Sequence, residues 1–145
     1  MRVLSCLALE HHFPSVLLAG LVCLLSCLLS MRLQRRSEQS DGGVQVAWLV
    51  ITAICLSAGI WSTHFIAMLG YRPSATVTLD VDQTALSALI IVCGTIVGSY
   101  LATLSWPFAR ALAGAVVGLS VTGMHYLGMA AYDLDAVVTW DVRYV

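Results

Sequence analysis

Residues 44–69 read VQVAWLVITAICLSAGIWSTHFIAML, and this stretch contains no Asp, Glu, Lys or Arg. A helix needs about 20 consecutive apolar residues to cross the hydrocarbon core of a bilayer. Because that core offers the backbone no water, a continuous apolar run of this length folds as a helix. The stretch therefore predicts one transmembrane helix.

Three more runs of the same kind flank it. They cover about Phe13–Met31, Gln83–Ser105 and Ala109–Ala131, with Arg110 as the only charge, at the start of the last run. Strands of a membrane barrel alternate between apolar and polar residues, whereas these runs are continuous. We therefore expect an all-α fold: one partial domain over residues 1–145, built as a bundle of four transmembrane helices with short loops.

The composition excludes several other classes of protein. Of the 145 residues, 59% are hydrophobic and 10% are charged, and the formal net charge is −1. An average soluble domain is about 45–50% apolar and about 25% charged. A near-neutral chain also has no field that would attract nucleic acid. These values exclude an ordinary soluble domain, a disordered chain and a nucleic-acid binder, and they make the lipid bilayer the expected partner.

The beginning of the chain allows a second interpretation, a cleaved signal peptide. Arg2 precedes an apolar run, and residues 24–27, Leu-Leu-Ser-Cys, resemble a lipoprotein cleavage box. Glu10, His11 and Pro14 interrupt the run that a signal peptide would need. A transmembrane first helix is the favoured interpretation.

The arginines predict an orientation. Arg32, Arg35 and Arg36 follow the first run, and Arg110 follows the turn between the third and fourth runs, so all four share one side. Arginine is enriched in cytoplasmic loops. We therefore expect a multi-pass protein of the bacterial inner membrane with both termini outside. His64 and His125 then lie about 8–9 Å below the outer ends of their helices.

An internal repeat links these two histidines. Residues 57–68 resemble residues 120–129, so that His64 pairs with His125, Phe65 with Tyr126, and Met68 with Met129. Residues that are four apart share one helix face. The repeat predicts two helical hairpins of similar design, each with one His and one Met on a single face of its second helix.

Small residues mark the faces on which the helices should pack. Gly114 and Gly118 form a G-x-x-x-G pattern in the fourth run, and Gly94 and Gly98 form another in the third. Such patterns allow membrane helices to approach closely. We expect both glycine pairs on packed faces, with His64 and His125 pointing into the bundle.

Three roles for the histidines remain open at this point. Ionisable residues inside a membrane indicate a functional site. Imidazole and thioether ligands suit soft metal ions, copper above all, whereas two histidines on different helices can also hold a haem. The structural alternative is a simple interhelical hydrogen bond, worth about 0.6–2 kcal/mol.

The same residues resemble a known family. Residues 123–131, GMHYLGMAA, are similar to the signature of the MHYT domain, a bacterial integral-membrane sensor domain named for its Met-His-Tyr-Thr motif. Residues 61–69, WSTHFIAML, resemble the first motif copy of that family. The resemblance covers essentially the whole chain, including His11 and His12 before the first run.

The resemblance implies a sensor that is not itself an enzyme. It implies copper binding near the outer face, detection of a diatomic gas or of redox state, and a signalling partner such as a cyclic-dinucleotide enzyme or a histidine kinase. The metal-ligand candidates are His64, Met68, Met124, His125, Tyr126 and Met129.

The chain departs from the family pattern at three points. Thr63 stands where the first motif has Met, and Leu127 replaces the Thr of the name-giving motif. The third motif copy is absent, so we expect a truncated domain. Two further groups of residues, His11 with His12 and Cys23 with Cys27, are weaker metal candidates. We expect the first pair to be interfacial and the cysteines to lie on the inner half of the bundle.

Overall fold

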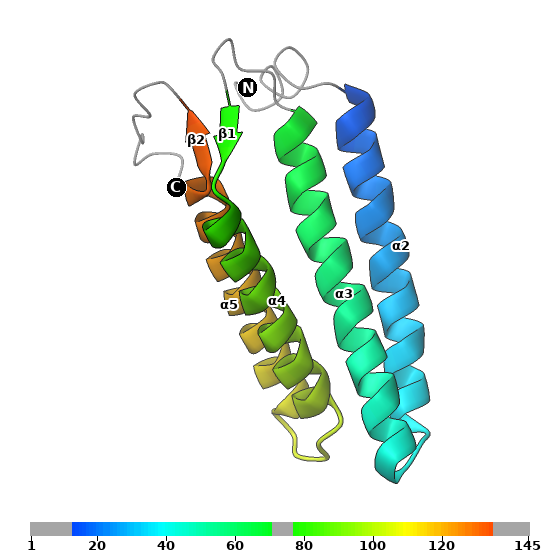
Figure 1. Cartoon of the computed structure of the whole chain (residues 1–145). Coiled ribbons are helices and arrows are strands. Elements are labelled where there is room, and N and C mark those ends of the chain that lie inside the picture. The colour runs from blue at the N-terminus through cyan, green and yellow to red at the C-terminus, as the bar shows by residue number, and fades with distance from the viewer. Residues whose placement is uncertain (1–12, 71–76, 135–145) are drawn as a thin grey trace.

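The structure, a computed structural model, describes residues 13–70 and 77–134. Its elements are α2 (Phe13–Glu38), α3 (Gly42–Gly70), β1 (Val77–Leu79), α4 (Val81–Ala102), α5 (Ala109–Ala130) and β2 (Tyr132–Leu134). The helices form two hairpins that lie side by side, α2 with α3 and α4 with α5 (Figure 1). All four helices are long and apolar enough to cross a membrane. The predicted all-α bundle of four spans is confirmed.

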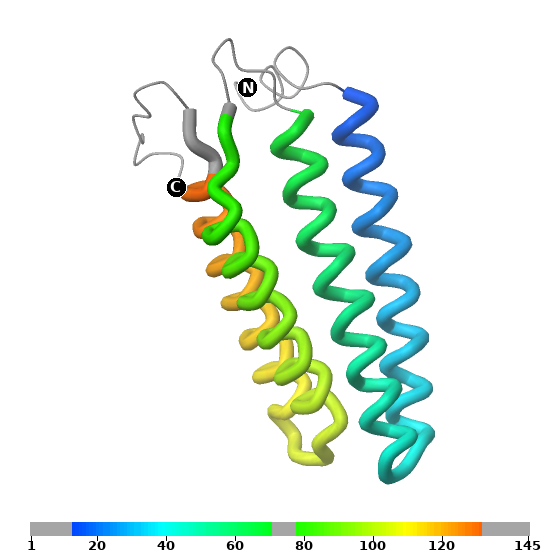
Figure 2. The backbone as a smooth tube through the Cα atoms, viewed as in Figure 1, coloured from blue at the N-terminus to red at the C-terminus, as the bar shows by residue number. Residues whose placement is uncertain are grey.

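The helix ends differ from the prediction, most of all in α2. This helix continues to Glu38 and includes Arg32, Arg35 and Arg36, which the sequence analysis placed after it. Leu, Gln, Arg and Glu are good helix formers, so nothing interrupts the helix after the apolar run. The chain then turns tightly, and α3 begins at Gly42, whose φ of 59° suits glycine. The backbone trace in Figure 2 shows how short this connection is.

A small antiparallel strand pair joins the other ends of α4 and α5. β1 pairs with β2 so that Thr78 lies opposite Asp133. Asp80 is the N-cap of α4, and its carboxylate accepts a hydrogen bond of 2.9 Å from the backbone N–H of Gln83. Its own backbone N–H donates to the carbonyl of Ala131 at 2.9 Å. The cap and the strands together fix one end of the second hairpin.

Each hairpin contains a close contact between a serine and a glycine. In the first, the side chain of Ser26 in α2 occupies the space where a Cβ on Gly59 would lie. In the second, the side chain of Ser120 in α5 occupies the same kind of space at Gly94 of α4. Glycine is required at both positions because a Cβ would overlap the serine.

The two hairpins meet mainly where α3 packs on α4. The Thr95 hydroxyl donates to the carbonyl of Ala53 at 3.2 Å, and the Trp61 indole N–H donates to the Ser87 hydroxyl at 3.3 Å. Ile91 lies between these bonds and is fully buried. Polar side chains thus tie the hairpins together, and the Ile91 side chain is packed between the two bonds.

One predicted packing face is wrong. Gly114 and Gly118 are exposed, and a Cβ on either would meet no atom of the described residues within 4 Å. α5 instead packs through a neighbouring stripe, in which Ala113, Met124 and Gly128 are buried. By contrast, Gly94 and Gly98 of α4 are buried against α5, as predicted. The G-x-x-x-G spacing identifies a small-residue face, but it does not say whether another helix covers that face.

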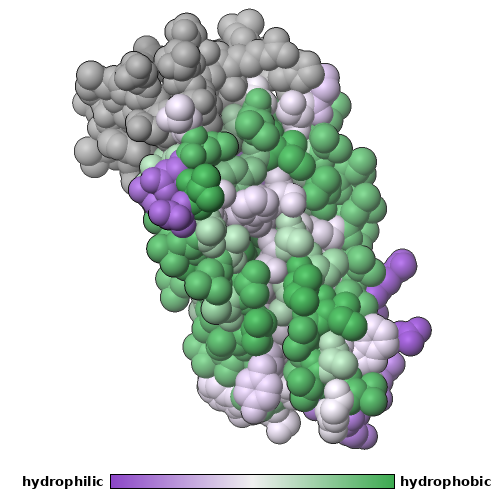
Figure 3. All heavy atoms as spheres, viewed as in Figure 1, coloured by the Kyte–Doolittle hydropathy of each residue, from purple (hydrophilic) through white to green (hydrophobic). Residues whose placement is uncertain are grey.

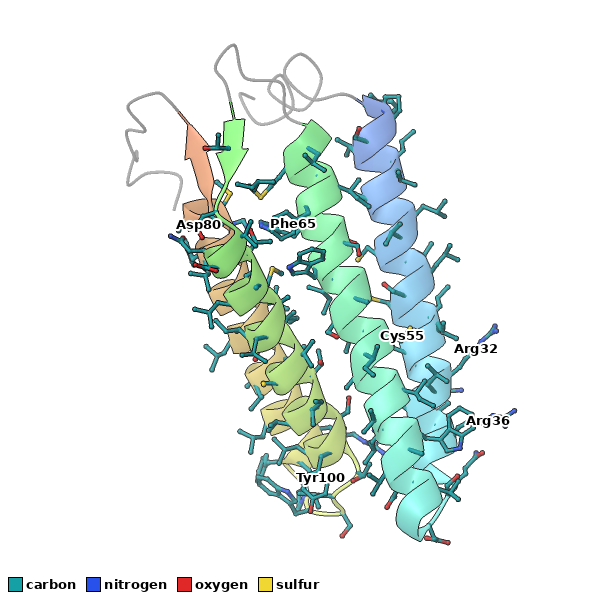
Figure 4. The ribbon with its side chains drawn as sticks, viewed as in Figure 1. Arg32, Arg36, Cys55, Phe65, Asp80 and Tyr100 are labelled. Atoms are coloured by element: carbon teal, nitrogen blue, oxygen red, sulfur yellow. The ribbon has the colours of Figure 1, made fainter. Side chains whose placement is uncertain are left out.

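The surface carries its charges at the two ends of the bundle. A broad apolar band covers the middle, with hydrophilic residues near the α2–α3 turn and near the start of α4 (Figure 3). Figure 4 shows Arg32 and Arg36 pointing away from the helices at one end, with Asp80 near the other. This distribution fits a protein that spans a bilayer, with apolar side chains in contact with lipid.

Candidate functional site

The site begins with a contact between His64 of α3 and His125 of α5. Their Nδ1 atoms are 3.3 Å apart, and the ring centroids are 5.1 Å apart at an interplanar angle of 78°. The two histidines lie six and five residues before the ends of their helices, roughly 8–9 Å below those ends. The repeat predicted one His on the second helix of each hairpin, and the structure brings these two side chains together. Both were expected to point into the bundle; His64 is half-buried, whereas His125 is exposed, so the prediction is wrong for His125.

Gly128 makes this contact possible. A Cβ at this position would lie 2.6 Å from Nε2 of His64 and 3.1 Å from its Cδ2. Any side chain would therefore push the His64 ring away from α5. Gly128 is not among the predicted site residues, although it pairs with Ala67 across the repeat, so the sequence contains a signal for a small residue at this position.

Aromatic rings surround the pair on both helices. His64 packs edge-on against Phe65 at 5.1 Å between centroids, and Phe65 is 4.5 Å from Trp61. His125 lies 5.6 Å from Tyr126 in a similar edge arrangement. Figure 4 shows Phe65 directed from α3 toward the second hairpin. Edge-to-face arrangements are among the preferred geometries of ring pairs, so these contacts favour the observed orientation of His64.

The other predicted ligands differ in how deeply they lie. Met124 is buried with 2% of its surface exposed, Met68 and Met129 are half-buried, and Tyr126 is 51% exposed. Within residues 13–70 and 77–134, no three His, Cys, Asp or Glu side chains gather where they could hold a metal ion. Among the predicted ligands, a third protein ligand at this site would therefore be a methionine thioether or Tyr126, and metal binding stays a prediction.

The remaining candidates lie elsewhere. His11 and His12 fall outside the described residues. Cys23 and Cys27 of α2 are half-buried free thiols, as is Cys55 of α3, and Cys93 of α4 is exposed. Cys23 and Cys27 lie on a helix that does not contribute to the histidine contact.

One feature of the pair suits a soft metal ion. The separation of 3.3 Å between the Nδ1 atoms matches two corners of a tetrahedron around an ion with N–metal bonds of about 2.0 Å. Nε2 of His64 is buried and has no hydrogen-bond partner among the described residues, but it lies against Gly128 and does not face the position between the two Nδ1 atoms. The same separation fits a hydrogen bond in which one Nδ1–H donates to the other Nδ1.

The chain is similar to known signalling proteins. The family MHYT, described as "Bacterial signalling protein N terminal repeat", matches residues 58–115 and 118–145, more than half of the chain. An "Uncharacterized signaling protein" of Caulobacter vibrioides is 34% identical over 97% of this chain and 17% of its own length. The "Cyclic di-GMP phosphodiesterase NbdA" of Pseudomonas aeruginosa is 36% identical over 83% of this chain and 16% of its own length.

A third relative has a related name. The "Bifunctional diguanylate cyclase/cyclic di-GMP phosphodiesterase MucR" of Pseudomonas aeruginosa is 29% identical over 83% of this chain and 18% of its own length. The chain thus spans less than a fifth of the length of each of these three relatives. Among solved structures, none matches the chain at a significant level. With four helices suited to a membrane and the His motif in both halves of the matched region, the chain belongs to the MHYT family of bacterial signalling proteins.

Proposed function

We propose that the chain is the membrane-embedded sensor part of a signalling system, and that His64 and His125 bind one copper ion. The observation that supports this proposal is the 3.3 Å contact between their Nδ1 atoms across two hairpins. Imidazole with a thioether from Met68, Met124 or Met129 is a donor set suited to copper, and the thioether favours the reduced ion. Copper held there would supply reversible one-electron chemistry and a position for a diatomic gas.

The geometry favours copper over haem. A haem held by both histidines would have to place its macrocycle between the two imidazoles. Their Nδ1 atoms are within hydrogen-bond distance, and Gly128 lies directly against His64, so the site has no such gap. A small ion needs only a small adjustment of the two rings.

The position of the pair suggests how the site would act on the rest of the molecule. α3 and α5 touch each other only sparsely, so the histidines form a large part of the direct connection between these two helices. A change in the distance that His64 and His125 prefer would change the angle between the hairpins. Rigid helices carry such a change to the opposite end of the bundle.

The relatives suggest the partner that would receive the signal. Two of them are named for cyclic di-GMP synthesis or hydrolysis, and this chain covers less than a fifth of either. We propose that the chain is not itself catalytic and that it regulates a cyclic di-GMP enzyme. The proposed location is the inner membrane, with the histidines near the outer face and the Arg-rich end in the cytoplasm.

The test is metal content per chain after loading with Cu(I) in detergent and removal of weakly bound ion. We expect one copper in the parent protein and little in His64→Ala or His125→Ala, because two imidazoles and a thioether leave no spare ligand. Thr122→Ala is the matched control, since Thr122 lies on α5, as His125 does, and is exposed. Folding is checked by circular dichroism and by elution as a single species.

Copper retained by both His variants would contradict the proposed site. Absence of copper in the folded parent would support the structural alternative, in which the pair is only an interhelical hydrogen bond. Met129→Leu nearly conserves volume and removes the sulfur. If Met129 is the thioether ligand, this variant will bind Cu(I) less tightly while its affinity for Cu(II) changes little; equal losses would exclude that role.

A further inference from the structure

A cavity of about 680 Å³ lies between the hairpins, in the half of the bundle away from the histidines. All four helices contribute to its wall, and its volume is within the usual range of ligand sites. The cavity exists because the facing residues are small: Thr52 of α3, Gly98 and Ala102 of α4, and Ala113 and Gly114 of α5. It shares no residue with the histidine site.

The mouth of the cavity is basic. Arg35 near the end of α2 and Arg110 near the start of α5 both line it, together with the carboxylate-bearing Glu38. Neither arginine forms an ion pair with any residue in the described ranges. Two guanidinium groups against one carboxylate leave a net positive charge at the mouth.

The lining changes from charged to apolar with depth. Ser30 lies five residues before Arg35 on α2, roughly 7–8 Å deeper along the helix. It is 4% exposed, and its hydroxyl has no hydrogen-bond partner among the described residues. Cys27, Leu56 and Val117 line the deeper, apolar part. From the mouth inward, the cavity thus presents cationic groups, then an unpaired hydroxyl, then an apolar wall. This order matches the phosphate, ester and acyl parts of a phospholipid.

A hydrogen bond between the two hairpins lies in the cavity wall. The Gln34 side-chain amide of α2 donates to the carbonyl of Ser99 in α4 at 3.2 Å. This bond joins the first helix to the second hairpin beside the cavity, so the space is part of the folded bundle. Basic pockets between transmembrane helices are suited to anionic lipid headgroups.

We propose that this cavity binds one anionic phospholipid from the leaflet at the Arg-rich end. Arg35 and Arg110 bind its phosphate, Ser30 donates to an ester oxygen, and one acyl chain lies along Leu56 and Val117. The lipid fills the space between the hairpins at the end opposite the histidine pair, so its occupancy affects how the hairpins pack.

The experiment uses the full chain in a neutral detergent and measures the unfolding temperature as lipid is added. The probes are dioleoylphosphatidylglycerol, dioleoylphosphatidylcholine with the same acyl chains, and inorganic phosphate alone. We expect phosphatidylglycerol to raise the unfolding temperature at lower concentrations than phosphatidylcholine, and phosphate alone to have little effect. Native mass spectrometry should detect one retained phosphatidylglycerol per chain.

Two sets of matched variants locate the effect. Arg35→Gln and Arg110→Gln should each weaken the apparent affinity for phosphatidylglycerol about fivefold, whereas Arg32→Gln, on the same helix but away from the cavity, should not. Gly114→Leu fills the cavity from a position where a Cβ meets no described atom within 4 Å, and Gly118→Leu adds the same bulk outside it. Only the first should abolish the preference for phosphatidylglycerol.

Three results would overturn the proposal. If phosphatidylcholine stabilised the protein as much as phosphatidylglycerol, Arg35 and Arg110 would not select an anionic headgroup. Equal stabilisation by phosphate alone would assign the site to a free anion instead of a lipid. A preference for phosphatidylglycerol that survives in Gly114→Leu and in both Arg variants would place the lipid elsewhere on the surface.

Discussion

At the scale of single residues, Gly128 decides whether the two histidines can touch. The His64 ring lies against the backbone of α5 only because position 128 has no Cβ. The repeat was enough to predict that His64 and His125 occupy equivalent places in the two hairpins. It could not predict the importance of Gly128, because that depends on how closely α3 and α5 approach.

Gly128→Ala should displace the His64 ring and weaken copper binding about tenfold or more, since supporting residues change metal affinity by such factors. The methyl group has to be accommodated 2.6 Å from Nε2, which should also lower stability by about 1–3 kcal/mol. Competition with a Cu(I) chelator and thermal unfolding measure the two effects.

Gly123→Ala provides the control for this variant. It adds the same methyl group to the same helix, where the nearest atom is Ile90 Cγ2 at an ordinary 3.5 Å. If Gly128→Ala and Gly123→Ala bind copper equally tightly, the contact between His64 and α5 has no part in the site.

At the scale of the elements, both hairpins have a serine–glycine contact between their two helices, but the serine and the glycine are on opposite helices in the two cases. Ser26 of α2 and Gly94 of α4 are each the fourteenth residue of their helix, and Gly59 and Ser120 pair across the repeat. One hairpin thus has serine on its first helix and glycine on its second, and the other has the reverse.

Gly59→Ala and Gly94→Ala should each destabilise the protein by about 1–3 kcal/mol, because the new methyl group overlaps a serine side chain. Gly118→Ala should be neutral or slightly stabilising, since its site is open and alanine favours helix. Unfolding in mixed micelles with a denaturing detergent measures all three.

Ser26→Gly should restore most of the stability that Gly59→Ala loses, because it removes the atoms that the methyl group overlaps. A double variant no more stable than Gly59→Ala alone would show that the loss has another cause. This rescue separates a local overlap from a general intolerance of substitutions in α3.

The sequence predicted the number and type of the helices correctly, but it predicted only part of the faces on which they pack. Long apolar runs predicted all four helices, because only a helix satisfies its backbone groups without water. The end of α2 was placed too early, because the apolar run stops at Met31 whereas the helix continues through residues that are equally good helix formers. Gly114 and Gly118 were assigned to a covered face and are exposed, because the spacing does not identify the neighbour.

At the scale of the whole molecule, the charges predict an orientation that places the two sites at opposite faces of the membrane. Arg32, Arg35, Arg36 and Arg110 lie at one end of the bundle, and Asp80 and Asp82 lie at the other, near the histidine pair. The chain's two hairpins would then be linked by copper near the outside and by a lipid near the inside.

Reporter fusions test this orientation. A reporter after Gln39 should be active only in the cytoplasm, and one after Asp80 only outside, because arginines anchor the α2–α3 turn inside. Replacing Arg32, Arg35 and Arg36 together by Gln should produce mixed orientations. A cytoplasmic reporter at Asp80 in the unaltered chain would place the histidines at the inner face instead.

X-ray absorption at the copper edge of the Cu(I)-loaded protein tests the central claim, that His64 and His125 share one ion. We predict scattering from two imidazole rings at about 2.0 Å, together with a sulfur shell from a methionine. His125→Ala should lose one imidazole or all bound copper, and Thr122→Ala should give the parent spectrum. A spectrum with no imidazole scattering, or one that is identical in His64→Ala, His125→Ala and the parent, would contradict the account.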